Sequence, residues 1–111
     1  MLLRIIPAVV AVTFMALASG SAAAKSARCF TTDDGEYDCT FVATDADGSF
    51  EISAPDKPKF SVVISEPGVA FVFGDYNDGG GNVALPGRYL RSQSDPACWV
   101  NEDTETQICA W

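Results

Sequence analysis

Residues 37–53 carry the pattern that decides the fold, and they read YDCTFVATDADGSFEIS. Two runs rich in β-branched and aromatic residues, 37–44 and 49–53, flank the polar segment 45–48. An Asp-Gly pair between two such runs is among the strongest short-range indications of a β-hairpin. The sequence therefore predicts two antiparallel strands joined at this turn.

The chain beyond this hairpin continues in short alternating segments. Segment 60–65 places Phe60, Val62 and Ile64 on one face of a strand, and segment 69–73 repeats the period of two. Further short strands are predicted at residues 83–85, 88–91, 98–100 and 107–111. We therefore expect an all-β domain, a small antiparallel β-barrel or sandwich, with the alternating aromatic and branched residues filling its interior.

The first 24 residues are typical of a secretory signal peptide. Arg4 precedes an apolar run over 5–18, and the small residues Ala22 and Ala24 suit the −3 and −1 positions of a cleavage site. The apolar run is shorter than the roughly 20 residues that a membrane-spanning helix needs. The expected organisation is a signal peptide at 1–24 and a single β domain at 25–111, exported to the periplasm without a membrane anchor.

The charge of residues 25–111 excludes several classes of function. This part of the chain holds six basic and fifteen acidic residues, a net charge of −9, and no histidine. A negative domain is poorly suited to nucleic acid, and the absence of histidine removes the commonest general base and metal ligand. We therefore expect a binding module without enzymatic activity, cofactor or metal.

Four cysteines, Cys29, Cys39, Cys98 and Cys109, predict a disulfide-stapled domain, because an even number in a small exported chain indicates disulfides. Three connectivities are open. Turn-forming residues lie midway between the first two cysteines and again midway between the last two, so each pair would face across a hairpin. We favour Cys29–Cys39 and Cys98–Cys109, each closing a loop of about ten residues worth on the order of 2–3 kcal/mol.

Two acidic segments invite a comparison with calcium sites. Segment 45–48 with Glu51 fails as an EF-hand loop, because the first and last ligand positions would fall on Ala43 and Ala54. Segment 75–82 gathers acidic and amide side chains beside three glycines. A flexible loop is the favoured interpretation of that segment, and a calcium-dependent module stays open as an alternative.

The second half of the chain has an asymmetric charge distribution. After Lys59, the only cations are Arg88 and Arg91, both within segment 85–92. One interpretation is that the two arginines form surface ion pairs with nearby carboxylates. The other is that they form a positively charged tip on an otherwise acidic domain. Such a tip suits a partner that is basic overall and has an anionic pocket, in which a guanidinium binds carboxylates in a bidentate way. Ser92 lies beside this pair.

Several short motifs resemble the periplasmic and membrane-bound inhibitors of c-type lysozyme. These are Tyr-x-Cys at 37–39, Leu-Pro at 85–86, Gly-x-Arg-Tyr-like residues at 87–89 and a following tryptophan at 99. The similarity is spread over residues 37–111. Residue by residue, Gly87, Arg88, Tyr89 and Trp99 match the family pattern.

The resemblance implies a small antiparallel β-barrel that blocks lysozyme by inserting a loop into its cleft. The resemblance implies contacts from Gly87, Arg88, Tyr89 and Trp99, and the position of Arg91 and Ser92 in the same segment adds these two residues to the expected contact set. C-type lysozymes are basic and cleave peptidoglycan with two carboxylates, which suits an acidic domain presenting an arginine. The alternative is an exported envelope protein with a structural or interaction role and no enzyme target. Whether two copies pair along an exposed sheet edge stays open.

Overall fold

The computed structural model describes residues 23–111, and in this range the chain is entirely β. The predicted signal peptide lies outside the described residues, apart from its last two positions. The strands are β1 (Lys25–Thr31), β2 (Gly35–Ala43), β3 (Phe50–Ser53), β4 (Lys59–Glu66), β5 (Val69–Asp75), β6 (Asn82–Ala84), β7 (Tyr89–Arg91), β8 (Cys98–Asn101) and β9 (Gln107–Ala110). Within residues 23–111, no helix is long and apolar enough to cross a membrane.

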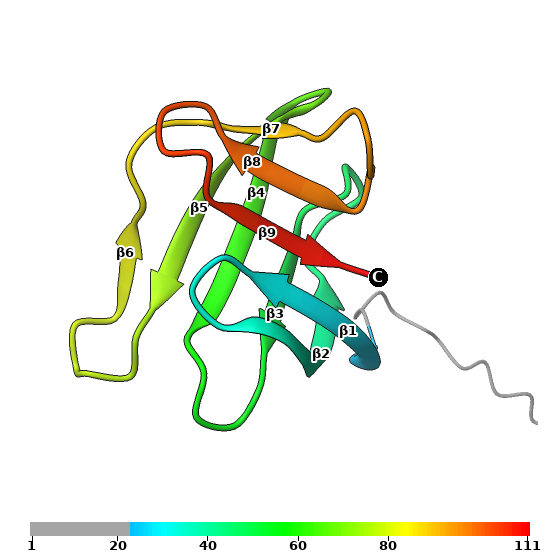
Figure 1. Ribbon diagram of the computed structural model, residues 1–111. Helices are drawn as coiled ribbons and strands as arrows, with labels where there is room; N and C mark the ends of the chain where they lie inside the picture. Colours follow the sequence, from blue (N-terminus) through cyan, green and yellow to red (C-terminus); the bar gives the residue numbers. More distant parts are fainter. Residues whose placement is uncertain (1–22) are drawn as a thin grey trace, which may run out of the picture.

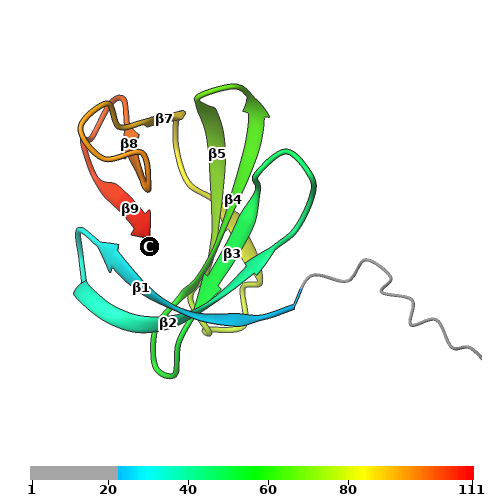
Figure 2. The ribbon, with the colours of Figure 1, turned by 90° about the vertical axis from the view of Figure 1, so that its right-hand side faces the viewer.

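The strands form one antiparallel sheet that closes on itself. Its order is β4-β3-β2-β1-β9-β8-β7-β5-β6, and β4 also pairs with β5. This additional pairing closes eight strands into a barrel, while β6 extends from β5 outside the ring (Figure 1). Figure 2 shows the strands curving around a common interior. Of the two expected architectures, the barrel is confirmed.

The hairpin predicted at 37–53 is confirmed as β2 and β3. Its turn is held by Asp45, whose Oδ1 accepts hydrogen bonds from the backbone N–H groups of Asp47 and Ser49 at 2.8 and 3.1 Å. Ser49 is buried, and its Oγ accepts a bond of 2.8 Å from the backbone N–H of Ile64. The turn is therefore an internally bonded structural element, joined to β4.

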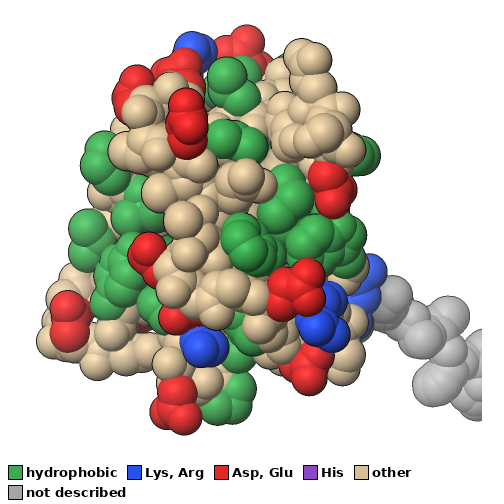
Figure 3. Space-filling view, viewed as in Figure 1, with side chains coloured by type: hydrophobic (Ala, Val, Ile, Leu, Met, Phe, Trp, Pro, Cys, Tyr) green, Lys and Arg blue, Asp and Glu red, His purple; other side chains and the backbone are tan. Residues whose placement is uncertain are grey.

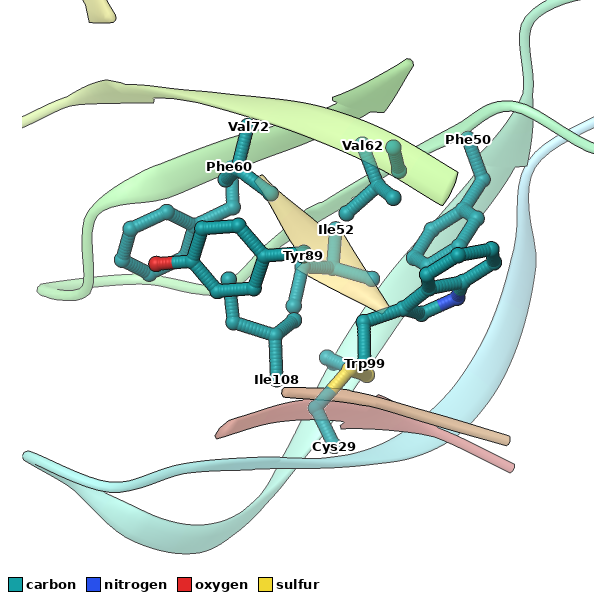
Figure 4. Packing of buried hydrophobic residues seen from close by; sticks show 11 residues of the cluster. Cys29, Phe50, Ile52, Phe60, Val62, Val72, Tyr89, Trp99 and Ile108 are labelled. Carbon is teal, nitrogen blue, oxygen red and sulfur yellow. A yellow bond between two sulfur atoms is a disulfide. The ribbon is translucent and has the colours of Figure 1, made fainter. Parts of the chain in front are cut away.

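Large hydrophobic side chains from β3, β4, β7, β8 and β9 fill most of the interior of the barrel. The buried cluster comprises Cys29, Cys39, Phe50, Ile52, Phe60, Val62, Ala70, Val72, Tyr89, Trp99 and Ile108 (Figure 4). An eight-stranded barrel has room for little more than its own inward side chains. Trp99, 2% exposed, is the largest of those that are fully buried.

The prediction that the alternating large residues of β5 fill the interior of the barrel is wrong. The large residue Phe71 is 42% exposed, and Val69 and Phe73 lie on the same outer face, while Ala70 and Val72 are buried. Aromatic rings from β3, β4, β7 and β8 already occupy the interior, so β5 contributes small residues to it. The alternation of 69–73 correctly predicts a strand. Both faces of this strand are apolar, however, so the pattern does not indicate which face turns inward.

Both predicted disulfides are present. Cys98 lies directly opposite Cys109 in the β8–β9 pair, as expected. Cys29 and Cys39 are also bridged, but they occupy diagonal positions, since Cys29 lies opposite Tyr37. The hairpin turns one residue earlier than expected because Gly35, with a φ of 73°, pairs directly with the end of β1.

Candidate functional site

The segments around Arg88 form one rigid unit, which we call the Arg88 tip and define as residues 85–88 and 101–106. Both segments lie at the upper left of Figure 1, between β6 and β7 and between β8 and β9. Asn101 joins them: its Nδ2 donates to the carbonyl of Pro86 at 2.8 Å. Its Oδ1 accepts from the backbone N–H groups of Asp103 and Thr104 at 2.8 and 3.0 Å. A single buried amide therefore holds both halves of the tip.

Arg88 is oriented by a two-point contact with Glu102. Its Nε and Nη2 donate to the two carboxylate oxygens at 2.9 and 2.8 Å, and the backbone N–H of Glu102 donates to the Arg88 carbonyl at 3.0 Å. The hydrogen bonds from Arg88 hold the pKa of the Glu102 carboxyl below its usual value, and the same bonds raise the pKa of Arg88. The Arg88 side chain stays 47% exposed, and its Nη1 has no hydrogen-bond partner within residues 23–111.

Gly87 is required by the geometry of the tip. Its φ is 77°, in the left-handed region that side chains with a Cβ rarely adopt. A Cβ at this position would lie 2.9 Å from Oδ2 of Asp103. Glycine thus allows the segment before β7 to approach the β8–β9 loop closely.

The six residues predicted to contact a partner do not form one surface. Tyr89 and Trp99 are 4% and 2% exposed and belong to the core. Arg91 stacks on the Trp99 ring, 4.3 Å from its centroid, and donates from Nη1 to the carbonyl of Pro96. Ser92 Oγ accepts backbone bonds within its own turn.

Only Gly87 and Arg88 of the predicted set therefore lie in the Arg88 tip. Arg91 and Ser92 follow at the other end of β7, where Arg91 and Glu66 line an open hollow of about 510 Å³. Arg88 is thus the exposed side chain of the predicted set at the tip, while Tyr89 and Trp99 pack inside the barrel.

A cavity of about 210 Å³ opens at the mouth of the barrel beside the tip. We call it the mouth cavity. Its lining residues are Thr31, Thr32, Asp33, Phe60, Tyr76, Leu85, Pro86, Tyr89, Asn101, Thr104, Thr106, Gln107 and Ile108. Aromatic and aliphatic side chains are thus combined with hydroxyl, amide and carboxylate groups. The lining contains no basic residue.

The surface around the tip and the mouth is predominantly acidic. Figure 3 shows acidic side chains spread over this face of the molecule, with basic side chains in only a few places. Four of the five ion pairs in the described part of the chain join side chains that are largely exposed or lie more than 3.5 Å apart, so Arg88–Glu102 is the best-formed one. Residues 23–111 contain no group of three or more His, Cys, Asp or Glu side chains arranged to hold a metal ion.

Four further residues shape this region without belonging to the predicted contact set: Asn101, Glu102, Asp33 and Tyr76. For Asn101 a usable pattern existed, because it follows Trp99 by two positions and so shares its inward face. An inward polar residue at a strand end indicates a side chain bonded to a loop. Glu102, Asp33 and Tyr76 lie far in sequence from their neighbours in the site, and no local pattern marks them.

No protein-family model matches this sequence, and no curated protein or solved structure shows significant similarity to the chain.

Proposed function

We propose that this domain is exported to the periplasm and there binds and inhibits c-type lysozyme through the Arg88 tip. The observation that carries the proposal is Arg88 itself: an exposed guanidinium held in one orientation on a bonded tip, on a body with a net charge of −9 over residues 25–111. The sequence resemblance at Gly87 and Arg88 points to the same position.

Charge supports this partner class at two distances. At long range, an acidic body attracts a basic protein and raises the rate of encounter. At short range, a c-type lysozyme presents two carboxylates in its cleft. Arg88 uses only two of its five N–H donors on Glu102, so Nη1 is available to a carboxylate of the partner.

The rigidity of the tip supports binding by insertion. Ordering a long side chain on binding costs roughly 0.5–1.5 kcal/mol, and a side chain that is already held avoids part of that cost. Glu102 orients Arg88 before a partner arrives, and Asn101 holds the loops on either side. Glu102 also competes for the guanidinium, so the proposal requires the partner to share Arg88 with it.

The test is the lysis of a peptidoglycan suspension by c-type lysozyme in the presence of the mature protein. We expect inhibition by the wild type, and inhibition about 30-fold weaker or worse for Arg88→Glu. Arg28→Glu is the matched control, because Arg28 is also an exposed arginine paired with a glutamate, Glu36, but lies in β1. This control should inhibit within about threefold of the wild type, since exposed charges contribute little.

Three outcomes would overturn the proposal. The first is no inhibition by the wild type at micromolar excess. The second is an equal loss in both variants, which would assign the effect to net charge alone. The third is an Arg88→Glu protein that fails to fold, as judged by its circular dichroism, together with full inhibition by the milder variant Arg88→Gln.

An envelope protein with a structural or interaction role and no enzyme target is the second candidate. The observation that favours it is the apolar pair Val63 and Phe71, which face each other across β4 and β5 on the outside of the barrel and are 40% and 42% exposed. Exposed apolar clusters mark interaction surfaces more often than single exposed residues do. Under this function, lysozyme activity is unchanged at any concentration of the protein.

A further inference from the structure

The mouth cavity has a floor that is apolar and aromatic. Phe60, Leu85 and Ile108 supply aliphatic and aromatic surface, and the rings of Tyr76 and Tyr89 complete the wall. Tyr76 packs edge-on against Phe60, with ring centroids 6.0 Å apart. Such a surface suits the carbon chain of a ligand, and the faces of the rings attract a cation.

The Tyr89 hydroxyl is the polar group that this cavity leaves without a partner. The residue is 4% exposed, and within residues 23–111 no group is hydrogen-bonded to its oxygen. In Figure 4 the Tyr89 hydroxyl lies on the side of its ring away from Trp99. Within the described residues, the buried side-chain oxygen that lacks a partner is that of Tyr37, so Tyr89 Oη is open to solvent at the cavity and a ligand atom would replace water at this phenol.

The electrostatics of the cavity favour a positive ligand. Asp33 lies on its rim and forms no ion pair within the described part of the chain. Burial, followed by the neighbouring Tyr89 and Asp33, raises the pKa of Tyr76. An anion would be repelled by the Asp33 carboxylate, whereas an ammonium group is attracted by this carboxylate and can donate a hydrogen bond to a phenol oxygen.

The size of the cavity limits the ligand. Sites that enclose drug-sized molecules measure roughly 300–1,000 Å³, and this one measures about 210 Å³. We propose that the mouth cavity binds a primary ammonium group on a short aliphatic chain, with the chain against Phe60 and Ile108 and the ammonium donating to Tyr89 Oη near Asp33. The cavity is lined in part by residues of the Arg88 tip, namely Leu85, Pro86, Asn101, Thr104 and Thr106, but Arg88 and Glu102 do not line it, so ammonium binding can be measured without lysozyme.

The test is a titration of the ¹⁵N-labelled mature protein with n-butylammonium, followed by amide chemical shifts. n-Butanol and butyrate are the matched neutral and anionic probes. We expect saturable shifts at Tyr89, Ile108 and Asp33 for the amine, and weaker binding for the alcohol and the acid. An affinity for butanol equal to that for butylammonium would overturn the proposal, because it would show that the cavity binds the carbon chain without selecting a positive charge. An absence of shifts at these residues would overturn it as well.

Two variants with matched controls locate the ammonium. Tyr89→Phe removes only the hydroxyl and should weaken butylammonium binding about tenfold, and Asp33→Asn should weaken it about threefold. Tyr37→Phe and Asp38→Asn alter the same residue types outside the cavity and should leave binding within about twofold. If Tyr89→Phe does not fold, Asp33→Asn decides, because Asp33 is exposed on the rim.

A further probe, Nα-acetyl-lysine amide, distinguishes the sources of the ammonium group. Binding as tight as that of butylammonium indicates that the mouth admits a lysine side chain with its backbone outside, as in a protein partner. Binding of butylammonium alone indicates a free small amine. Binding of neither contradicts the site.

Discussion

At the scale of single residues, Asn101 and Arg88 have different roles in the tip: one is buried and structural, and the other is exposed and charged. Asn101 is 2% exposed and bonds one backbone carbonyl and two backbone N–H groups from two segments. Arg88 lies outside, where its contact with Glu102 is open to solvent. The buried residue therefore maintains the shape of the tip, while the exposed pair sets its chemistry.

Replacing Asn101 by alanine should lower the free energy of unfolding by about 1–3 kcal/mol, because it removes three hydrogen bonds and leaves their backbone partners unmatched. Urea denaturation followed by tryptophan fluorescence measures this change. Asn82→Ala, at an exposed position in β6, is the control and should stay within about 0.5 kcal/mol of the wild type. A similar loss in both variants would contradict the role of Asn101.

The Glu102 carboxyl should make a pH-dependent contribution to stability. Its pKa in the folded state lies below the ordinary value of 4.5, because Arg88 donates hydrogen bonds to it. A carboxyl whose pKa is lowered by folding stabilises the folded state at pH values above its ordinary pKa. This contribution is lost as the pH falls through the folded-state pKa. Melting temperatures of the wild type and Glu102→Gln should therefore differ at pH 7 and converge as the pH falls below 4.5 and through the folded-state pKa. A constant difference would exclude the Arg88 contact as its cause.

At the scale of strands, the two disulfides join similar hairpins in different surroundings. They span 10 and 11 residues, so the loop-closure contributions are nearly equal. Cys29 and Cys39 belong to the central cluster between β1 and β2, whereas Cys98 and Cys109 lie outside that cluster. All four cysteines are buried, so both bridges pack against their surroundings, but only the first bridge belongs to the central cluster.

Removal of either bridge by paired alanine substitutions should cost about 2–3 kcal/mol from chain entropy. The pair Cys29→Ala and Cys39→Ala should cost about 1 kcal/mol more, because the lost sulfur atoms leave a void in the core. Urea unfolding of the two double variants compares them directly. A greater loss from Cys98→Ala and Cys109→Ala would show that the packing of the first bridge contributes little.

At the scale of the whole molecule, the surface is acidic and the closed ring leaves few free sheet edges. Closure through β4 and β5 pairs both ends of the eight-stranded ring, so only β6 presents an unpaired edge among the described strands. Closed barrels thereby avoid edge-to-edge aggregation. Under the proposed function, the charge of −9 over residues 25–111 attracts a basic partner at long range.

Association with a basic lysozyme should depend strongly on ionic strength. We expect the association rate constant to fall about tenfold between roughly 0.02 and 0.5 M sodium chloride, because salt screens charges beyond the Debye length. The dissociation rate should change much less. Surface plasmon resonance at several salt concentrations measures both rates. A salt-independent association rate would argue against steering by the acidic surface.

Local sequence patterns predicted the β class and the hairpin at 37–53, and they favoured the observed cysteine pairing over two alternatives. Each of these depends on residues close together in the chain: an Asp-Gly turn, a period of two, and turn residues midway between cysteines. Local patterns of this kind are readable because the side chains involved become neighbours through a single turn.

Only the tertiary structure decided the barrel closure, the inward face of β5 and the composition of the site. The β4–β5 pairing that closes the ring, the burial of Tyr89 and Trp99, and the link from Asn101 to Pro86 depend on the curvature and register of the entire sheet. The mouth cavity likewise combines residues from 31 to 108. An eight-stranded ring has a small interior, and competition for that space assigns each side chain to the core or to the surface.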